Sequence, residues 1–99
     1  MLTINKEKNG NDLVISPKGH LDTLSSPELE AELKSSMPDA ESLVMDLSGL
    51  EYISSAGLRV LLSAQKVMSK KGGMKVINCN EVVKEVFEVT GFVDVLDIE

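Results

Sequence analysis

The chain has 99 residues, which is enough for one domain with a single hydrophobic core. Apolar residues make up 42% and charged residues 26%, a composition that excludes disorder as the main state. The net charge of −6 argues against nucleic acid and against an anionic membrane surface as partners, because both attract clustered Lys and Arg. We therefore expect one domain over residues 1–99.

The chain shows none of the usual signals for export or membrane insertion. Residues 1–10 lack the apolar centre of a signal peptide, and no apolar run approaches the ~18 residues that span a membrane. A single cysteine, Cys79, cannot form an intramolecular disulfide and suits a reducing compartment. We interpret Met1 as a native start and expect a cytoplasmic protein.

The first predicted element is an antiparallel hairpin. Two short apolar runs, residues 2–4 and 13–15, flank Asn9-Gly10, and Asn-Gly favours a tight turn because both residues tolerate positive φ. Pro17 and Gly19 are expected to end the second strand.

Helices and strands are predicted to alternate after the hairpin. Ser26 and Pro27 are typical of a helix start, and that helix should end before Pro38. The apolar run 43–47 predicts a buried strand, and Ser48-Gly49 begins a loop.

The second half repeats the alternation of helix and strand. A helix is predicted from about Gly57 to Gly72-Gly73, followed by a strand over 74–77. The next helix stops at Gly91 and has an apolar stripe made of Val82, Val83, Val86 and Phe87. A short strand is predicted within 93–98. The fold class is therefore α/β, with a mixed, mostly parallel central sheet and helices packed on it.

Most catalytic and metal-binding signals are absent from the sequence. A zinc site made mainly of His and Cys needs about four ligands, and the chain has one residue of each type. His20 is a candidate general base, although a lone histidine in a loop is more often simply exposed. Cys79 is more often a small packed residue than a reactive one. We expect no enzyme, no metal and no cofactor.

The informative segment runs from Asp46 to Leu62, as a strand, a loop and a helix. Ser54 and Ser55 lie at the helix start, beyond the carboxyl end of a strand, where free N–H groups and the helix dipole favour an anion. Three interpretations stay open from these residues alone. One serine caps the helix, a serine acts as a nucleophile without an evident base, or a serine accepts a phosphoryl group.

Three segments of the chain resemble the STAS family, the domain of bacterial anti-sigma-factor antagonists and of the cytosolic tails of sulfate transporters. The resemblance covers nearly the whole chain. Its matching segments are Gly19-His20-Leu21-Asp22, the central motif Asp46 to Leu50 with Tyr52 to Leu58, and Gly72-Gly73 before Met74-Lys75-Val76. Because no transmembrane segment is evident, the resemblance points to the antagonist branch.

The resemblance implies a function and a site. An antagonist binds an anti-sigma factor that is also a serine kinase, frees the sigma factor, is released by phosphorylation of one serine and is reset by a serine phosphatase. By its place two residues before Gly57, that serine is Ser55. The family often has Asp immediately before it, so Ser54 in that place is the second candidate. The implied partner-binding residues are Asp22, Thr23, Ser54, Ser55, Ala56, Gly57 and Arg59. The alternative function is a nucleotide- or ligand-binding STAS module in a larger signalling complex.

Overall fold

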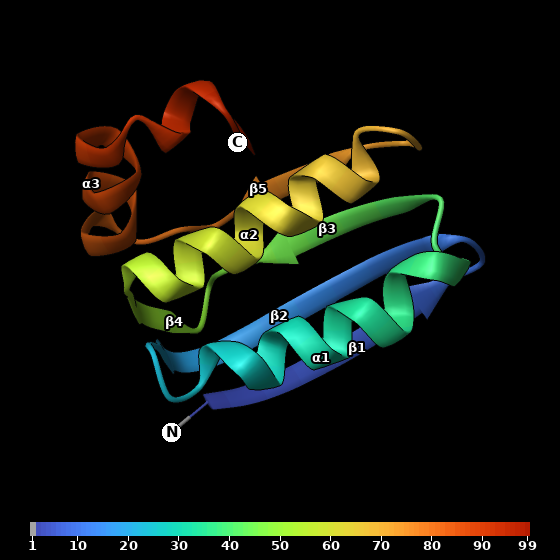
Figure 1. The fold of residues 1–99 in the computed structure, drawn as a ribbon, viewed down its shortest axis with the longest axis horizontal. Helices are drawn as coiled ribbons and strands as arrows, with labels where there is room; N and C mark the ends of the chain where they lie inside the picture. Colours follow the sequence, from blue (N-terminus) through green and yellow to red (C-terminus); the bar gives the residue numbers. More distant parts are fainter. Residues whose placement is uncertain (1) are drawn as a thin grey trace.

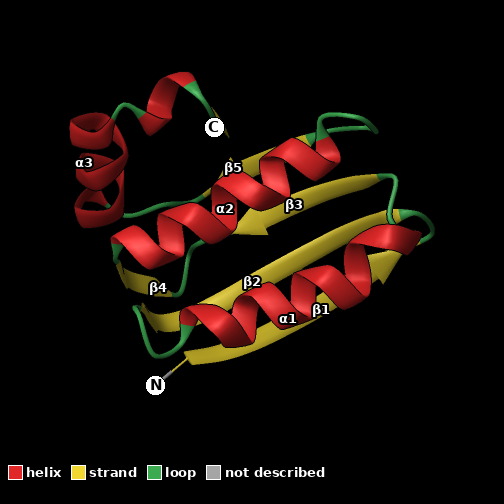
Figure 2. Ribbon diagram, viewed as in Figure 1, coloured by secondary structure: helices red, strands yellow, loops and turns green. Residues whose placement is uncertain are grey.

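The computed structural model describes residues 2–99, which form a six-stranded sheet and three α-helices (Figures 1 and 2). The strands are β1 (Leu2–Asn9), β2 (Asp12–Leu21), β3 (Ser42–Asp46), β4 (Leu50–Ile53), β5 (Met74–Ile77) and β6 (Asp97–Ile98). The helices are α1 (Ser26–Ser36), α2 (Ser55–Met68) and α3 (Glu81–Thr90), with short 3-10 turns at Met37–Asp39 and Phe92–Asp94.

The predicted α/β class and mixed sheet are confirmed. The strand order is β1-β2-β3-β5-β6, and β4 pairs with β2 beyond the end of β3. β1 is antiparallel to β2, and every other strand pair is parallel. α1 and α2 lie side by side over one face of the sheet, whereas α3 stands at one end, next to β4 (Figure 1).

The core lies between this sheet face and the two helices. Alternation along the strands places one set of side chains in the core, namely Leu13, Ile15, Leu43, Met45, Met74 and Val76. The helices add Leu29, Leu33, Leu58, Leu61, Ala64 and Met68 at helical spacing. These contacts fix the start of α2 against the carboxyl ends of the strands.

The hairpin forms as predicted, but its turn is centred one residue later. Asn9 pairs with Asp12, so the two central residues are Gly10 and Asn11. Only Gly10 has a positive φ, of 65°, whereas an Asn-Gly turn of the expected kind needs two. The strand register decides the turn, because it pairs Asn9 within the ladder.

β2 runs to Leu21, so the prediction that Pro17 and Gly19 end it is wrong. Residues 12–15 of β2 pair with β3 and residues 19–21 pair with β4, which leaves Pro17 in the stretch between these two partners. A proline is tolerated there because its missing N–H costs no ladder bond on that side. Gly19, at φ 106°, accompanies a register shift as the strand changes neighbour.

β4 is absent from the sequence prediction, which has a loop in its place. Its four residues are buried only at the two ends, Leu50 and Ile53, so they show neither alternation nor an apolar run. The strand exists because β2 extends past β3 and leaves a free edge that β4 fills. It leads directly into Ser54 and the start of α2.

Two helix boundaries also differ from the prediction. Ser25, not Ser26, flanks α1, and the Ser26 hydroxyl instead donates a hydrogen bond to the carbonyl of Asp22. α2 ends at Met68, before the predicted glycines. The Lys71 ammonium that follows donates to three carbonyls after α1, those of Met37, Pro38 and Ala40. These carbonyls lie in and just after the 3-10 turn Met37–Asp39, so Lys71 ties the end of α2 to the segment that follows α1.

The C-terminal segment departs most from its predicted form. α3 is capped by the Asn80 side chain, which accepts a hydrogen bond from the Val83 N–H, and it ends at Gly91 in the left-handed conformation. Of the predicted strand within 93–98, only Asp97–Ile98 pairs with β5, because Val93 and Asp94 belong to the 3-10 turn and a short irregular stretch follows it. Val82, expected in the buried stripe, is exposed.

Candidate functional site

The two serines of the motif lie where β4 gives way to α2. Ser54 has an extended backbone, with φ −98° and ψ 176°, and Ser55 is the first helical residue. The Ser54 N–H donates to the Leu21 carbonyl at 2.8 Å, which joins the helix start to the end of β2. The helix therefore begins at a point fixed by two strands.

Ser54 caps the helix, as the first of the three interpretations requires. Its hydroxyl accepts a hydrogen bond from the Gly57 N–H at 3.4 Å, and its carbonyl accepts the first helical bond from Leu58 at 3.0 Å. The side-chain bond is long, so we expect the cap to stabilise the helix only weakly. The capping role falls to Ser54 and leaves Ser55 free for another one.

The Ser55 side chain is exposed. None of the side-chain hydrogen bonds among residues 2–99 involves its hydroxyl. As the first helical residue, it lies beside N–H groups that have no intrahelical acceptor and at the positive end of the helix dipole. A phosphoryl group on this hydroxyl would meet solvent and a favourable field rather than the core.

Gly57 is buried beneath the two serines, although the resemblance places it among the partner-binding residues. A Cβ at this position would lie 2.7 Å from Leu21 Cγ and 2.9 Å from Ile53 Cγ1. The missing side chain lets α2 approach β2 and β4 closely. Gly57 thus sets the position of the serines and offers no side chain to a partner.

The loop between β2 and α1 is organised by Asp22, a predicted partner-binding residue. Asp22 Oδ1 accepts hydrogen bonds from the Leu24 N–H, the Ser25 N–H and the Ser25 hydroxyl, each at 3.0 Å. The single proton of this hydroxyl is shared between Asp22 Oδ1 and the His20 carbonyl, and the hydroxyl oxygen accepts a bond from the Asp22 N–H. These bonds, chiefly from Ser25, hold the pKa of Asp22 below its usual value. The carboxylate therefore serves the loop itself.

Three further residues that were predicted to bind a partner lie around one hollow between the starts of α1 and α2. Thr23, Ala56 and Arg59 line it, together with Ser26, Pro27, Glu30 and Val60. Its volume is about 200 Å³. Typical pockets for small molecules hold roughly 300–1,000 Å³, so the hollow favours contact with a protein side chain over a nucleotide.

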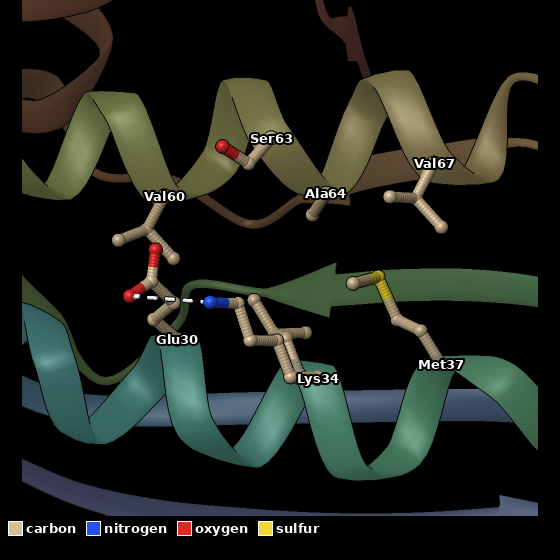
Figure 3. A pocket seen from close by; sticks show the side chains of 8 residues that line it. Glu30, Lys34, Met37, Val60, Ser63, Ala64 and Val67 are labelled. Atoms are coloured by element: carbon tan, nitrogen blue, oxygen red, sulfur yellow. Dashed lines mark ion pairs between the residues drawn. The ribbon is translucent and has the colours of Figure 1, made fainter.

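A second hollow continues between the same two helices (Figure 3). It is lined by Leu33, Met37, Val60, Ala64 and Val67, with Ser63 and an ion pair at its edge. The ion pair joins Glu30 Oε1 and Lys34 Nζ at 3.9 Å. Because the Lys34 side chain is largely exposed and that of Glu30 is half exposed, the pair contributes little to stability. This hollow offers few polar groups to a ligand.

The other sequence candidates do not join the serine site. His20 is exposed and packs edge-on against Tyr52, with ring centroids 6.1 Å apart. No side-chain hydrogen bond within residues 2–99 connects it to either serine, so no base for a nucleophile is in place. Cys79 is half-buried against the core. Across the described residues, no cluster of three potential metal ligands and no helix fit to span a membrane is found.

Comparison with known proteins decides the family. The model of the STAS domain matches residues 3–99. The chain belongs to the STAS domain family. A STAS relative from Bacillus subtilis, named anti-sigma-B factor antagonist, is 30% identical over 98 residues, covering 98% of this chain and 90% of the relative. The protein BtrV of Bordetella bronchiseptica is 33% identical over 99 residues, covering 98% of this chain and 85% of the relative.

A solved STAS structure has nearly the same fold. An anti-sigma factor antagonist from Mycobacterium paratuberculosis superposes with a TM-score of 0.91 at 25% identity, covering 99% of this chain and 85% of the other. Domains of this family branch are regulatory binding proteins, in agreement with the expectation that this STAS chain is not an enzyme.

The STAS site includes residues that sequence reasoning missed. Ser25 is buried and bonds with Asp22, and the Asp22-to-Ser25 spacing is typical of a local side-chain turn that could have revealed it. Leu24 is 90% exposed at the tip of that loop, and Tyr52 is 45% exposed on β4. No local pattern predicts these exposures, because they depend on how the β2–α1 loop and β4 are placed against the rest of the fold.

Proposed function

We propose that this STAS protein is an anti-sigma factor antagonist. It binds a cognate anti-sigma factor that is also a serine kinase, frees the sigma factor in the cytoplasm, and is released when Ser55 is phosphorylated. A serine phosphatase restores the unmodified form. The observation that carries the proposal is the exposed, unbonded Ser55 at the start of α2, in a chain whose relatives are named antagonists.

The mechanism uses charge rather than a change of fold. Phosphorylation adds about −1.5 to −2 charges to a hydroxyl that lies in the middle of the proposed contact surface. Like-charge repulsion and desolvation then oppose docking, most of all beside acidic groups of the partner. A coupling of ~3 kcal/mol would weaken binding more than a hundredfold. The structure needs no rearrangement, because the Ser55 side chain is already exposed.

Phosphate mapping tests the proposal. The protein is incubated with its cognate anti-sigma factor kinase and with Mg-ATP, and the product is mapped by mass spectrometry alongside Ser55→Ala and Ser54→Ala variants. We expect phosphate on Ser55, lost in Ser55→Ala and kept in Ser54→Ala. Phosphate confined to Ser54 would move the switch by one residue. The absence of phosphate from both serines would contradict the proposed regulation by phosphorylation.

A binding measurement tests the repulsion separately. Ser55→Asp should lose affinity for the kinase in calorimetry, because a fixed negative charge then lies in the contact. Ser63→Asp is the matched control, since Ser63 is an exposed serine on the same helix and lines the neighbouring hollow. Equal affinities for the two variants would contradict a contact centred on Ser55.

A further inference from the structure

The outer face of α3 carries a row of valines that has no role in the proposed switch. Val82, Val86 and Val89 recur at spacings of four and three residues, so they lie on one side of the helix, and Val93 follows beyond its end. We call these four residues the valine stripe. Val82 is 54% exposed, Val89 80% and Val93 42%. Val82, Val86 and Val89 also line a shallow hollow in the surface.

The most exposed residues of the stripe, Val82 and Val89, lie away from the face that holds α3 in place, whereas Val86 is half-buried and also packs against the core. Val83 and Phe87 are completely buried, so the helix is already anchored to the core on its inner side. Seven large apolar side chains are exposed among residues 2–99, and four of them, Val82, Val89, Val93 and Val95, fall between residues 82 and 95. Single exposed apolar residues are normal, but a cluster of this kind marks an interaction surface.

The charges around the stripe indicate what kind of surface fits it. Glu81, Glu85 and Glu88 flank the valines, and Lys84 is the single cation on the helix. A second copy of this chain would bring two acidic rims together, at a cost in repulsion. A groove with an apolar floor and a basic rim would complement both the valines and the glutamates. This complementarity favours a different protein as the occupant.

α3 lies at the same end of the molecule as the start of α2 (Figure 1), where Ser55 is the first helical residue. α3 packs against β4, and the Asn80 side chain donates a hydrogen bond to the Leu50 carbonyl at 3.0 Å. β4 runs from this contact into Ser54, with the half-exposed Tyr52 on the way. A partner seated on the start of α2 can therefore reach α3 across one short strand.

We propose that the valine stripe is a second anchor for the anti-sigma factor, inserted into an apolar groove with a basic rim. The inference rests on the proposed function and adds a contact that phosphorylation does not touch. An apolar helix face with this spacing is suited to docking in a groove, and valines lose little side-chain freedom on burial. Ser55 thus controls whether the complex forms, and the valine stripe on α3 adds affinity to it.

Binding of the purified kinase to surface variants tests the inference. Val89→Lys should weaken binding about tenfold or more, because it removes an apolar contact and opposes the basic rim. Val89→Glu should lose less, since its charge suits that rim. Val67→Lys is the matched control, because Val67 is 43% exposed on α2 but lies in the hollow beside α1. Circular dichroism checks that each variant folds, and Val89→Ser gives a neutral replacement.

Each result decides between the two proposals. Unchanged affinity in the Val89 variants, with Ser55→Asp still defective, would overturn the anchor and leave the switch intact. No binding of the wild-type chain to the kinase would overturn both. A dimer in sedimentation that Val89→Lys dissolves would assign the stripe to a second copy of the chain and also overturn the anchor. Weaker binding in Val89→Lys, less so in Val89→Glu, supports it.

Discussion

The start of α2 and the outer face of α3 lie at the same end of the molecule and have opposite chemistry. At the start of α2, backbone and side-chain hydrogen bonds fix Ser54 and the loop at Asp22, and Gly57 allows close packing beneath. On α3, the exposed valines make contact with solvent alone on their outer side. The first region has a fixed geometry around a hydroxyl whose phosphorylation would oppose docking, whereas the second offers apolar area that no single modification removes.

The comparison separates two contributions to recognition. Fixed polar geometry gives specificity and a point of control, because a dianion at Ser55 changes the interaction sharply. Apolar area gives affinity that depends little on salt or phosphorylation. A regulatory domain needs both, since a switch is useful only on a complex that forms readily without the modification.

The largest expected effect distinguishes the two faces of α3. Phe87→Ala should lower the free energy of unfolding by about 3–5 kcal/mol, because a fully buried ring leaves a cavity. Val89→Ala should change it by less than about 0.5 kcal/mol, because Val89 is exposed. Urea denaturation measures both. Similar losses in the two variants would show that the stripe is part of the folded core.

The next effect concerns the packing beneath the serines. Gly57→Ala should destabilise the fold by about 1–3 kcal/mol, because the added methyl meets the buried side chains of Leu21 and Ile53. Gly10→Ala is a control for a glycine with open space but a positive φ, which separates backbone strain from crowding. A neutral Gly57→Ala would mean that α2 is not held as close to the strands as the structure places it.

A smaller effect separates the roles of the two serines. Ser54→Ala should cost about 0.5–1 kcal/mol through the lost cap, toward the low end because its hydrogen bond is long. Ser55→Ala should be close to neutral for stability and should abolish phosphorylation. Thermal unfolding together with phosphate mapping checks both halves. If Ser55→Ala lost stability and Ser54→Ala did not, Ser55 rather than Ser54 would be the capping residue.

The smallest effect is a pH dependence of the Asp22 loop. Folding lowers the pKa of Asp22 below 3.8, so the ionised carboxylate stabilises the fold above this pH, and the stabilisation is lost as pH falls through the lower, folded value. Wild type should therefore lose more thermal stability than Asp22→Asn between about pH 5 and pH 2. Melting temperatures across that range measure the difference. If the melting temperatures of wild type and Asp22→Asn fell equally with pH, the Asp22 carboxylate would not organise the loop.

Much of the fold and of the switch site could be predicted from local signals. The apolar run at 43–47 predicts β3, and helical spacing with the serines before Gly57 predicts the start of α2. Ser54 and Ser55 were both candidates for the cap, and the structure gives that role to Ser54. These features depend on neighbours within a few residues, so the chain encodes them directly.

Other features depend on partners far away in the sequence. β4 has no strand pattern of its own and forms because the end of β2 offers an unpaired edge. Pro17 fits inside β2 because the strand changes neighbours around it. Arg59 and Thr23 share a hollow because two helices pack side by side.

The sequence by itself determined the alternation of helices and strands, the helix start that presents Ser55, and the apolar residues of α3. The tertiary structure alone decided which of those apolar residues face the core, since a helix with valines on both sides can bury only the side that meets another element. Val83 and Phe87 are buried in the core, and Val82 and Val89 remain exposed. The periodicity of a helix marks its apolar positions, but only packing determines which of them remain available to a partner.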